Sequence, residues 1–206
     1  MVGIRERKKQ RTRRALIQAA LRLFDEKGYE ETTLAEIAAA ADVSTRTFFS
    51  YFASKEDVLF FDAAARIETT LALVATRRPD EAPPELLMRI VRAGLAWTVE
   101  DQDFRPEDVR LRMRLVMTVP ALQARALHLL FDNQLRLTRA LREAYPGELG
   151  PVEAAAAVGA LAGATKLAVV ASLNRDGSLE QAAEAALQAA EITVRGLASL
   201  GRPAAR

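Results

Sequence analysis

One segment of the sequence carries side chains whose chemistry suits nucleic acid. The outward positions of a predicted helix hold four hydroxyls, one guanidinium and one phenyl ring: Ser44, Thr45, Arg46, Thr47, Phe49 and Ser50. Short hydroxyls suit the oxygens of a phosphate backbone, and a guanidinium can donate two hydrogen bonds to the edge of a guanine. The pattern indicates a surface that binds DNA, with Arg46 as a possible base reader.

The residues around this surface predict a helix-turn-helix over residues 33–52. Thr33 and Glu36 have the spacing of a capping box, in which each side chain accepts a hydrogen bond from a free main-chain N–H at a helix start. Asp42 falls in the turn, where a left-handed residue is often needed, and Ser44 can cap the second helix. The inward positions are apolar: Leu34, Ile37, Ala38, Val43, Phe48 and Phe52. An ordinary helical hairpin with a solvated polar face would show the same caps, so the caps alone leave both interpretations open.

The charge of the chain is unevenly distributed. The whole chain has a net charge of +2, but residues 1–55 carry 11 basic and 7 acidic side chains, and the first fourteen residues hold seven basic ones against Glu6. We expect such a basic end to touch a polyanion. The arm from Arg5 to Arg14 could follow the DNA backbone or enter a minor groove; the alternative is a solvated helix end. Lys55 adds a cation at a later helix start, beside free amides that could bind a phosphate.

One part of the chain strongly resembles the TetR family of bacterial transcriptional regulators. The likeness rests on AALRLFDEKGY at residues 19–29, on TTLAEIA at residues 32–38 and on ADVSTRTFFSYFASKE at residues 41–56. It covers about residues 8–60, and the rest of the chain is similar to the family in its size and helical make-up. The resemblance implies a DNA-binding domain followed by a larger domain that binds an effector and dimerises.

By this resemblance, the second helix of the motif lies in the major groove of DNA and its neighbours grip the backbone. The implied base or groove contacts are Ser44, Thr45, Arg46 and Ser50. The implied phosphate contacts are Thr33, Thr47, Tyr51 and Lys55. Two positions depart from the common pattern of the family. Phe49 stands where many members have Tyr and lacks a hydroxyl for a phosphate, and Arg46 stands where many have Gly.

Helical periodicity extends over nearly the whole chain and predicts an all-α protein of about nine helices. We expect helices over residues 6–27, 34–40, 45–52, 54–77, 84–100, 106–118, 120–144, 151–174 and 178–200. Gly28 follows the first of these as its stop. We place an N-terminal three-helix DNA-binding domain at residues 1–53 and a helical effector-binding and dimerisation domain at residues 54–206.

The larger domain is rich in alanine near its end and carries two glycines four residues apart, Gly159 and Gly163. Small side chains let helices approach closely. By the family resemblance, the last two long helices pair with those of a second subunit as a four-helix bundle; a core within one chain is the alternative from composition alone. A two-fold dimer would read a palindromic operator, because one short recognition helix gives little specificity.

The resemblance also implies a small-molecule effector bound among the helices of residues 54–144. Candidate lining residues are Met88, Trp97, Phe104, Met113, Met117, His128 and Phe131. Methionines and aromatics at helical spacing more often pack an ordinary core. The chemical identity of the effector therefore stays open, and an apolar or amphipathic molecule is the default expectation. We expect the effector to act through the helix at residues 54–77, which joins both domains, and to release a repressor from DNA.

The sequence lacks the motifs of several other classes of protein. Cysteine is absent and His128 is the single histidine, which excludes thiolate chemistry and sites that need two imidazoles. No phosphate-binding loop, nucleotide fingerprint or nucleophile elbow occurs, so we expect no catalytic residue, metal or cofactor. A helical-bundle enzyme or an interaction module for a small apolar ligand is the alternative. The apolar stretch at residues 154–173 contains Lys166 and many alanines, which favours a buried helix of a cytoplasmic protein over a membrane span.

Overall fold

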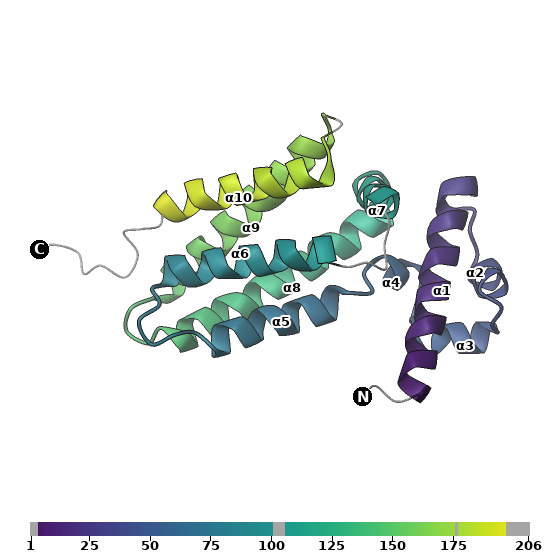
Figure 1. Cartoon of the computed structure of the whole chain (residues 1–206), viewed down its shortest axis with the longest axis horizontal. Coiled ribbons are helices and arrows are strands. Elements are labelled where there is room, and N and C mark those ends of the chain that lie inside the picture. Colours follow the sequence, from purple (N-terminus) through teal and green to yellow (C-terminus); the bar gives the residue numbers. More distant parts are fainter. Residues whose placement is uncertain (1–3, 101–105, 176, 197–206) are drawn as a thin grey trace, which may run out of the picture. The chain divides into compact units, whose positions relative to one another are not determined.

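The computed structural model describes residues 4–100, 106–175 and 177–196, and over these ranges the chain forms ten α-helices and no strand (Figure 1). The helices are α1 (Ile4–Lys27), α2 (Leu34–Ala40), α3 (Thr45–Phe49), α4 (Lys55–Leu59), α5 (Ala63–Ala75), α6 (Pro83–Glu100), α7 (Pro106–Thr118), α8 (Pro120–Ala144), α9 (Pro151–Leu173) and α10 (Leu179–Gly196). The predicted all-α class is confirmed. Helices α2, α7 and α8 have the predicted bounds; the predicted end of the last helix at residue 200 lies outside the described residues.

The helices form two compact units. Unit 1 contains the residues up to Ala63 together with α7 and the start of α8, as far as His128. Unit 2 contains most of α5, α6, the rest of α8, α9 and α10. Unit 1 therefore includes the whole domain predicted at residues 1–53 and, in addition, α4 and a later segment of the chain.

The hydrophobic core of unit 1 explains why the later segment belongs to it. Helix α1 supplies one apolar face, and α2, α3 and α4 each add one or two buried side chains. The larger members are Leu16, Ile17, Leu21, Phe24, Ile37, Phe48, Val58 and Leu59. Leu111 and Leu115 of α7 and Leu122 of α8 are buried in the same cluster. Burial of these three leucines ties α7 and the start of α8 to the helix-turn-helix.

The prediction of a single helix at residues 54–77 is wrong, because the structure has two helices there, α4 and α5. A turn at residues 60–62 separates them, and Phe60 ends α4 with φ −112° and ψ 23°. Phe61 and Asp62 in this turn contact arginines of α1 and α7. These contacts hold the turn to distant parts of unit 1. The division also accounts for ten helices in the described ranges where about nine were expected.

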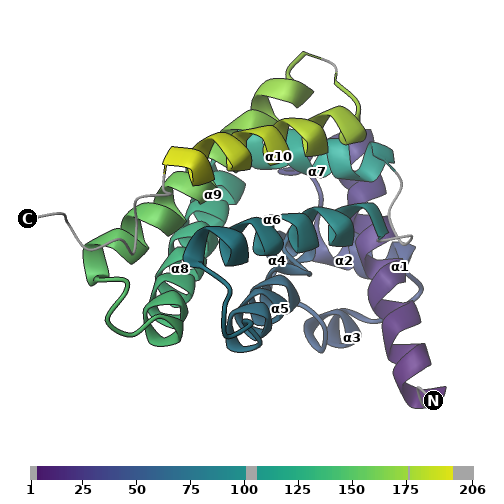
Figure 2. The ribbon, with the colours of Figure 1, turned by 60° about the vertical axis from the view of Figure 1, so that its left-hand side comes forward.

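Unit 2 has its own core, built from α5, α6, α8, α9 and α10. Helices α9 and α10 lie side by side (Figure 2), and α10 also packs against α6. Alanines at every fourth position of α10, Ala182, Ala186 and Ala190, are buried. Their small side chains let α10 lie close to its neighbours.

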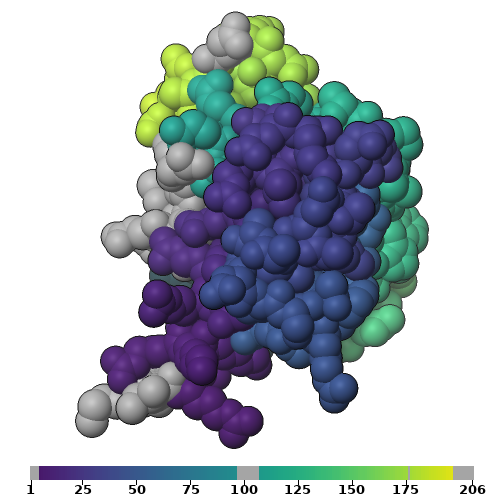
Figure 3. Space-filling view, turned by 90° about the vertical axis from the view of Figure 1, so that its right-hand side faces the viewer, coloured from purple at the N-terminus to yellow at the C-terminus, as the bar shows by residue number. Residues whose placement is uncertain are grey.

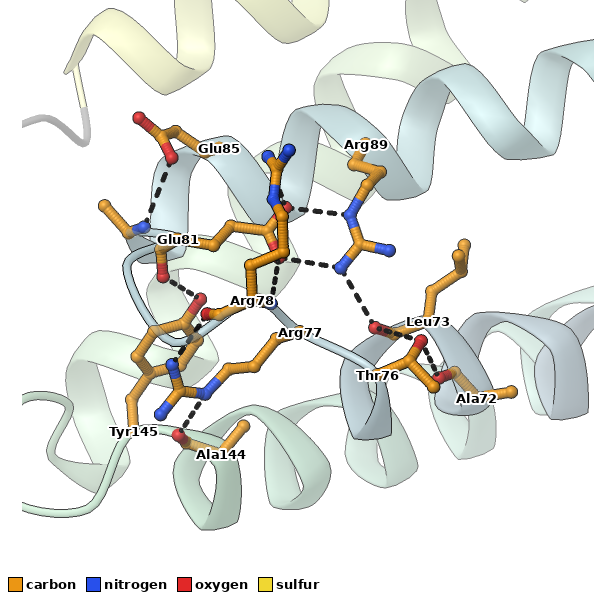
Figure 4. Close-up of polar contacts among 11 residues, drawn as sticks. Ala72, Leu73, Thr76, Arg77, Arg78, Glu81, Glu85, Arg89, Ala144 and Tyr145 are labelled. Atoms are coloured by element: carbon orange, nitrogen blue, oxygen red, sulfur yellow. Dashed lines mark hydrogen bonds and ion pairs between the residues drawn. The ribbon is translucent and has the colours of Figure 1, made fainter.

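A buried carboxylate organises the turn between α5 and α6 (Figure 4). The Glu81 side chain is fully buried, and Arg89 donates to its two oxygens at 2.8 Å and 2.7 Å. The main-chain N–H of Arg78 donates to the same carboxylate at 3.2 Å. The Tyr145 hydroxyl of α8 donates to the Glu81 carbonyl at 2.8 Å. Hydrogen bonds from the Arg89 guanidinium hold the pKa of the Glu81 carboxyl below its usual range.

Candidate nucleic-acid interface

Helices α2 and α3 and the turn between them form the predicted helix-turn-helix. The Thr33 hydroxyl accepts from the N–H of Glu36 at 3.3 Å, and the N–H of Thr33 donates to the Glu36 carboxylate at 2.9 Å, which confirms the capping box. The Ser44 hydroxyl caps α3 by accepting from the N–H of Thr47 at 3.1 Å. Asp42 has φ 55° in the turn, so the predicted left-handed residue is confirmed.

One side of α3 faces solvent. It consists of Thr45, Arg46, Phe49 and Ser50, all exposed. Their spacing puts them on one face of a helix. On the opposite side Phe48 is fully buried in the core of unit 1, while Thr47 and Tyr51 are half-buried between the two sides. We call Thr45, Arg46, Phe49 and Ser50 the outward face of α3. Figure 3 views unit 1 with α1 in purple and the following helices in blue.

Several of the predicted contact hydroxyls already have partners inside the motif. The Thr33 hydroxyl donates to the Glu36 carboxylate at 2.7 Å, and the Ser44 and Thr47 hydroxyls are 2.9 Å apart. The Ser50 hydroxyl donates to the Thr47 carbonyl at 2.6 Å. These bonds fix the hydroxyls in place. The O–H groups of Thr33 and Ser50 already donate within the motif, so donation to a phosphate oxygen requires them to turn from these partners. Their contacts with DNA stay predictions.

Lys55 has a structural role that its position in the sequence does not reveal. Its ammonium donates to the main-chain carbonyls of Tyr29, Thr32 and Glu30 at 2.9 Å, 3.3 Å and 3.4 Å, and lies 4.2 Å from the centre of the Tyr29 ring. The Tyr29 hydroxyl donates in turn to Glu56 at 2.6 Å. Lys55 thus fastens the loop after α1 to α4, and its contact with a phosphate stays a prediction.

The basic arm is the beginning of α1, and its side chains from Arg5 to Arg11 are exposed. Arg13 makes a different contact. Its guanidinium donates to the main-chain carbonyl of Phe61 and lies 5.6 Å from the Phe61 ring and 6.0 Å from the Phe52 ring. From the sequence, Arg13 is one of several cations of the basic arm. No local signal indicates its contact with Phe61, which lies 48 positions later in the chain.

Three ion pairs join α7 and the start of α8 to earlier parts of unit 1. They are Arg112–Asp62 at 2.7 Å, Arg125–Asp57 at 3.0 Å and Arg114–Asp25 at 2.8 Å. The first is the most buried, with the Asp62 side chain 8% exposed, and the Arg112 guanidinium also lies 5.2 Å from the Phe61 ring. Sequence reasoning missed these pairs, whose partners lie 50 or more residues apart.

The predicted effector-lining residues have different surroundings. Met88 belongs to the buried core of unit 2. The others that can be placed are half-buried or exposed: Met113, Met117, His128 and Phe131. The side chain of Trp97 and residue Phe104 lie outside what the structure describes. The structure does not gather the described members into one cluster within either unit, and their contact with an effector stays a prediction.

The two glycines predicted for the dimer interface lie on α9. Gly159 is exposed and Gly163 half-buried, and a Cβ atom added at either would meet nothing within 4 Å. Exposed apolar side chains accompany them, Val152 and Leu167 on α9 at 76% and 70%. By length and composition α9 could cross a membrane, as could the core helix of a water-soluble protein, and 22% of its most apolar 18-residue stretch is buried within the chain. Ala154, Ala157, Val158 and Leu161 form a buried face of α9 in the core of unit 2, so the expectation of a buried helix is met on that face and not on the exposed one.

Residues 16–60, which cover the second half of α1 and all of α2 to α4, match the family model "Bacterial regulatory proteins, tetR family". The chain is 41% identical over 140 residues to the HTH-type transcriptional regulator TcmR of Streptomyces glaucescens. This match covers 66% of the chain and 62% of TcmR, so the chain spans less than two thirds of that relative's length.

Solved structures share the fold over most of the chain. SmeT in its triclosan complex has a TM-score of 0.63 at 21% identity, over 90% of each chain; SmeT is the repressor of a multidrug efflux pump of Stenotrophomonas maltophilia. Thermus thermophilus FadR, a repressor in complex with lauroyl-CoA, has a TM-score of 0.50 at 25% identity, over 94% of this chain and 96% of FadR. The helix-turn-helix at residues 33–52 therefore lies in a segment that matches the tetR family of bacterial regulatory proteins, and the described chain shares the fold of such regulators.

Proposed function

We propose that this chain is a cytoplasmic transcriptional regulator that binds a palindromic operator as a homodimer and acts as a repressor released by a small-molecule effector. The observation that carries the proposal is the outward face of α3. This face presents one guanidinium, two hydroxyls and one phenyl ring, while Phe48 and Phe52 anchor the opposite side in the core. The arrangement suits a helix inserted into the major groove.

An unpaired apolar surface on α9 and α10 supports the homodimer. Positions 152, 156, 159, 163 and 167 of α9 share one face at helical spacing, and all hold small or apolar residues. Ile192 of α10 is 64% exposed. The open space beside Gly159 and Gly163 would accept the helix of a second copy at short distance. Such a dimer removes this apolar surface from water, which stabilises it.

The contacts around Phe61 and Asp62 support coupling between an effector and the DNA-binding helices. Arg112 on α7 holds the turn between α4 and α5, and Arg13 on α1 contacts the same turn and the Phe52 ring. Helix α8 begins in unit 1 and continues into unit 2. An effector that displaces α7 or α8 would therefore act on the turn between α4 and α5. Through Arg13 it would also act on Phe52, at the end of the helix-turn-helix.

An apolar or amphipathic effector suits the proposal best. SmeT binds triclosan and FadR binds lauroyl-CoA, and both ligands have a large apolar part. The regions of this chain assigned to the effector are mainly aliphatic, with Met88 and several leucines in the core of unit 2. Hydrophobic side chains with few polar groups are typical of small-molecule sites.

Selection of duplexes from random DNA by the full-length protein tests the proposed function. We expect a two-fold symmetric sequence, bound by two chains per duplex, whose mobility shift is reversed by an apolar small molecule from a panel. Failure to enrich any sequence at low salt would contradict DNA reading by this chain. An enriched sequence without two-fold symmetry would contradict the dimer.

A further inference from the structure

The phenyl ring of Phe49 is the unusual member of the outward face of α3. It is 55% exposed, while the rings of Phe48 and Phe52 beside it are 0% and 4% exposed. Exposed Phe side chains are costly in water, since their apolar surface gains nothing from solvent. A ring on the face assigned to the major groove can gain free energy by packing against an apolar group in the groove.

The ring has a defined position. Its centre lies 5.7 Å from that of Phe48, with the two planes at 87°, an edge-to-face contact. Phe48 is itself held 5.6 Å from the ring of Phe52 in the core of unit 1. This chain of rings supports Phe49 from beneath, so that its outer part is presented to a ligand with little loss of side-chain freedom.

The chemistry of the ring restricts what it can recognise. A phenyl group neither donates nor accepts the hydrogen bonds that distinguish most base edges in the major groove. The thymine 5-methyl group is the apolar feature among those edges. Resting on the proposed DNA-binding function, we infer that Phe49 selects a thymine in each half of the operator by packing against its methyl group.

The position of Arg46 locates the thymine. Residues 46 and 49 share one side of α3 and are three residues, or about 4.5 Å, apart along the helix axis. Successive bases of one strand are about 3.4 Å apart along the duplex axis. The thymine therefore lies one or two base pairs from the guanine that Arg46 reads.

Replacing thymine by deoxyuridine in the selected operator tests the inference, since it removes the methyl group and keeps base pairing. We expect the full-length protein to lose about fourfold in affinity for each methyl removed, or about 15-fold over both half-sites. Phe49→Ala binds the thymine and deoxyuridine operators equally. Phe49→Leu, which keeps an apolar side chain, retains part of the preference. Deoxyuridine at a thymine outside the half-sites is the control and has no effect.

Two results would overturn the inference and leave DNA binding itself intact. One is an operator with no thymine within two base pairs of the guanine read by Arg46. The other is a deoxyuridine penalty of equal size in the wild type and in Phe49→Ala. Failure of the wild type to bind any duplex would instead contradict the proposed function. Thermal unfolding of Phe49→Ala near the wild-type temperature shows that the variant is folded.

Discussion

Arg112 of α7 donates a 2.7 Å hydrogen bond to the buried carboxylate of Asp62, in the turn that separates α4 from α5. The same guanidinium lies 5.2 Å from the ring of the preceding residue, Phe61, which Arg13 of α1 also contacts. One turn is thus held from two helices that are far apart in sequence. The turn lies where a continuous helix was predicted over residues 54–77, and its contact with Arg112 links α7 to the unit that carries the helix-turn-helix.

The Arg112–Asp62 pair is more buried than the Arg114–Asp25 pair, so removing each carboxylate should lower the free energy of unfolding by a different amount. Asp62→Asn removes the charge opposite Arg112, which is 29% exposed, and we expect the free energy of unfolding to fall by about 2 kcal/mol. Asp25→Asn removes the charge opposite Arg114 on the same helix, where both side chains are 60% or more exposed, and we expect less than about 0.5 kcal/mol. Urea unfolding followed by circular dichroism measures both. Equal losses would show that the Asp62 pair does not hold the turn.

The contact with Lys27 and the capping box with Thr33 predict an unusual acidity at Glu36. Hydrogen bonds from Lys27, at 2.5 Å, and from Thr33 lower the pKa of its carboxyl from 4.5 to about 2. Because the folded-state pKa lies below the unfolded one, the stability that Glu36 contributes is complete above pH 4.5 and is lost as the pH falls towards 2. Carboxyl ¹³C NMR measures the titration. We expect a midpoint near 2 in the wild type and a clearly higher one in Lys27→Met; a wild-type midpoint near 4.5 would contradict the contacts of Glu36 with Lys27 and Thr33.

The buried carboxylate of Glu81 predicts a large loss of stability in unit 2. Glu81→Gln leaves Arg89 and the N–H of Arg78 opposite a neutral amide, and we expect the free energy of unfolding to fall by about 3 kcal/mol. Glu85→Gln is the control, because that side chain is exposed and accepts one 3.4 Å bond from the N–H of Ala82. Its loss should stay below about 1 kcal/mol. Thermal unfolding of both variants measures the two losses. A Glu81→Gln protein as stable as the control would contradict the network in Figure 4.

The apolar face of α9 predicts the oligomeric state. Leu167→Glu places a charge on the proposed interface, where a buried, unpaired charge is strongly unfavourable, so we expect monomers. Phe131→Glu is the matched control, since Phe131 of α8 is similarly exposed at 65% but lies on another helix. Sedimentation velocity at micromolar concentration measures the mass of each. A Leu167→Glu protein that remains dimeric would place the interface elsewhere.

The features that could be predicted from sequence are those whose partners lie close in the chain. The bonds between Thr33 and Glu36 and between Ser44 and Thr47 span three residues each, and Asp42 takes its left-handed conformation within one turn. Helical spacing was enough to place Arg46 on an exposed face.

The features that could not be predicted depend on distant partners. Residue type and spacing do not indicate that Arg13 contacts Phe61 or that Asp62 pairs with Arg112, because folding alone brings them together. The break between α4 and α5 lies at the residues that make these contacts. Lys55 was expected to bind phosphate from its place at a helix start, whereas its partners in the structure are carbonyls some 25 residues earlier in the chain.

The affinity of Arg46→Ala for single-base variants of the selected operator tests most directly whether the outward face of α3 reads bases. We expect a loss of about 1–3 kcal/mol on the preferred sequence and loss of discrimination at one base position in each half-site. Arg22→Ala, which removes an exposed arginine from α1, should leave that discrimination unchanged. A uniform loss across all sequences with discrimination intact would make Arg46 a phosphate contact and contradict base reading by this face.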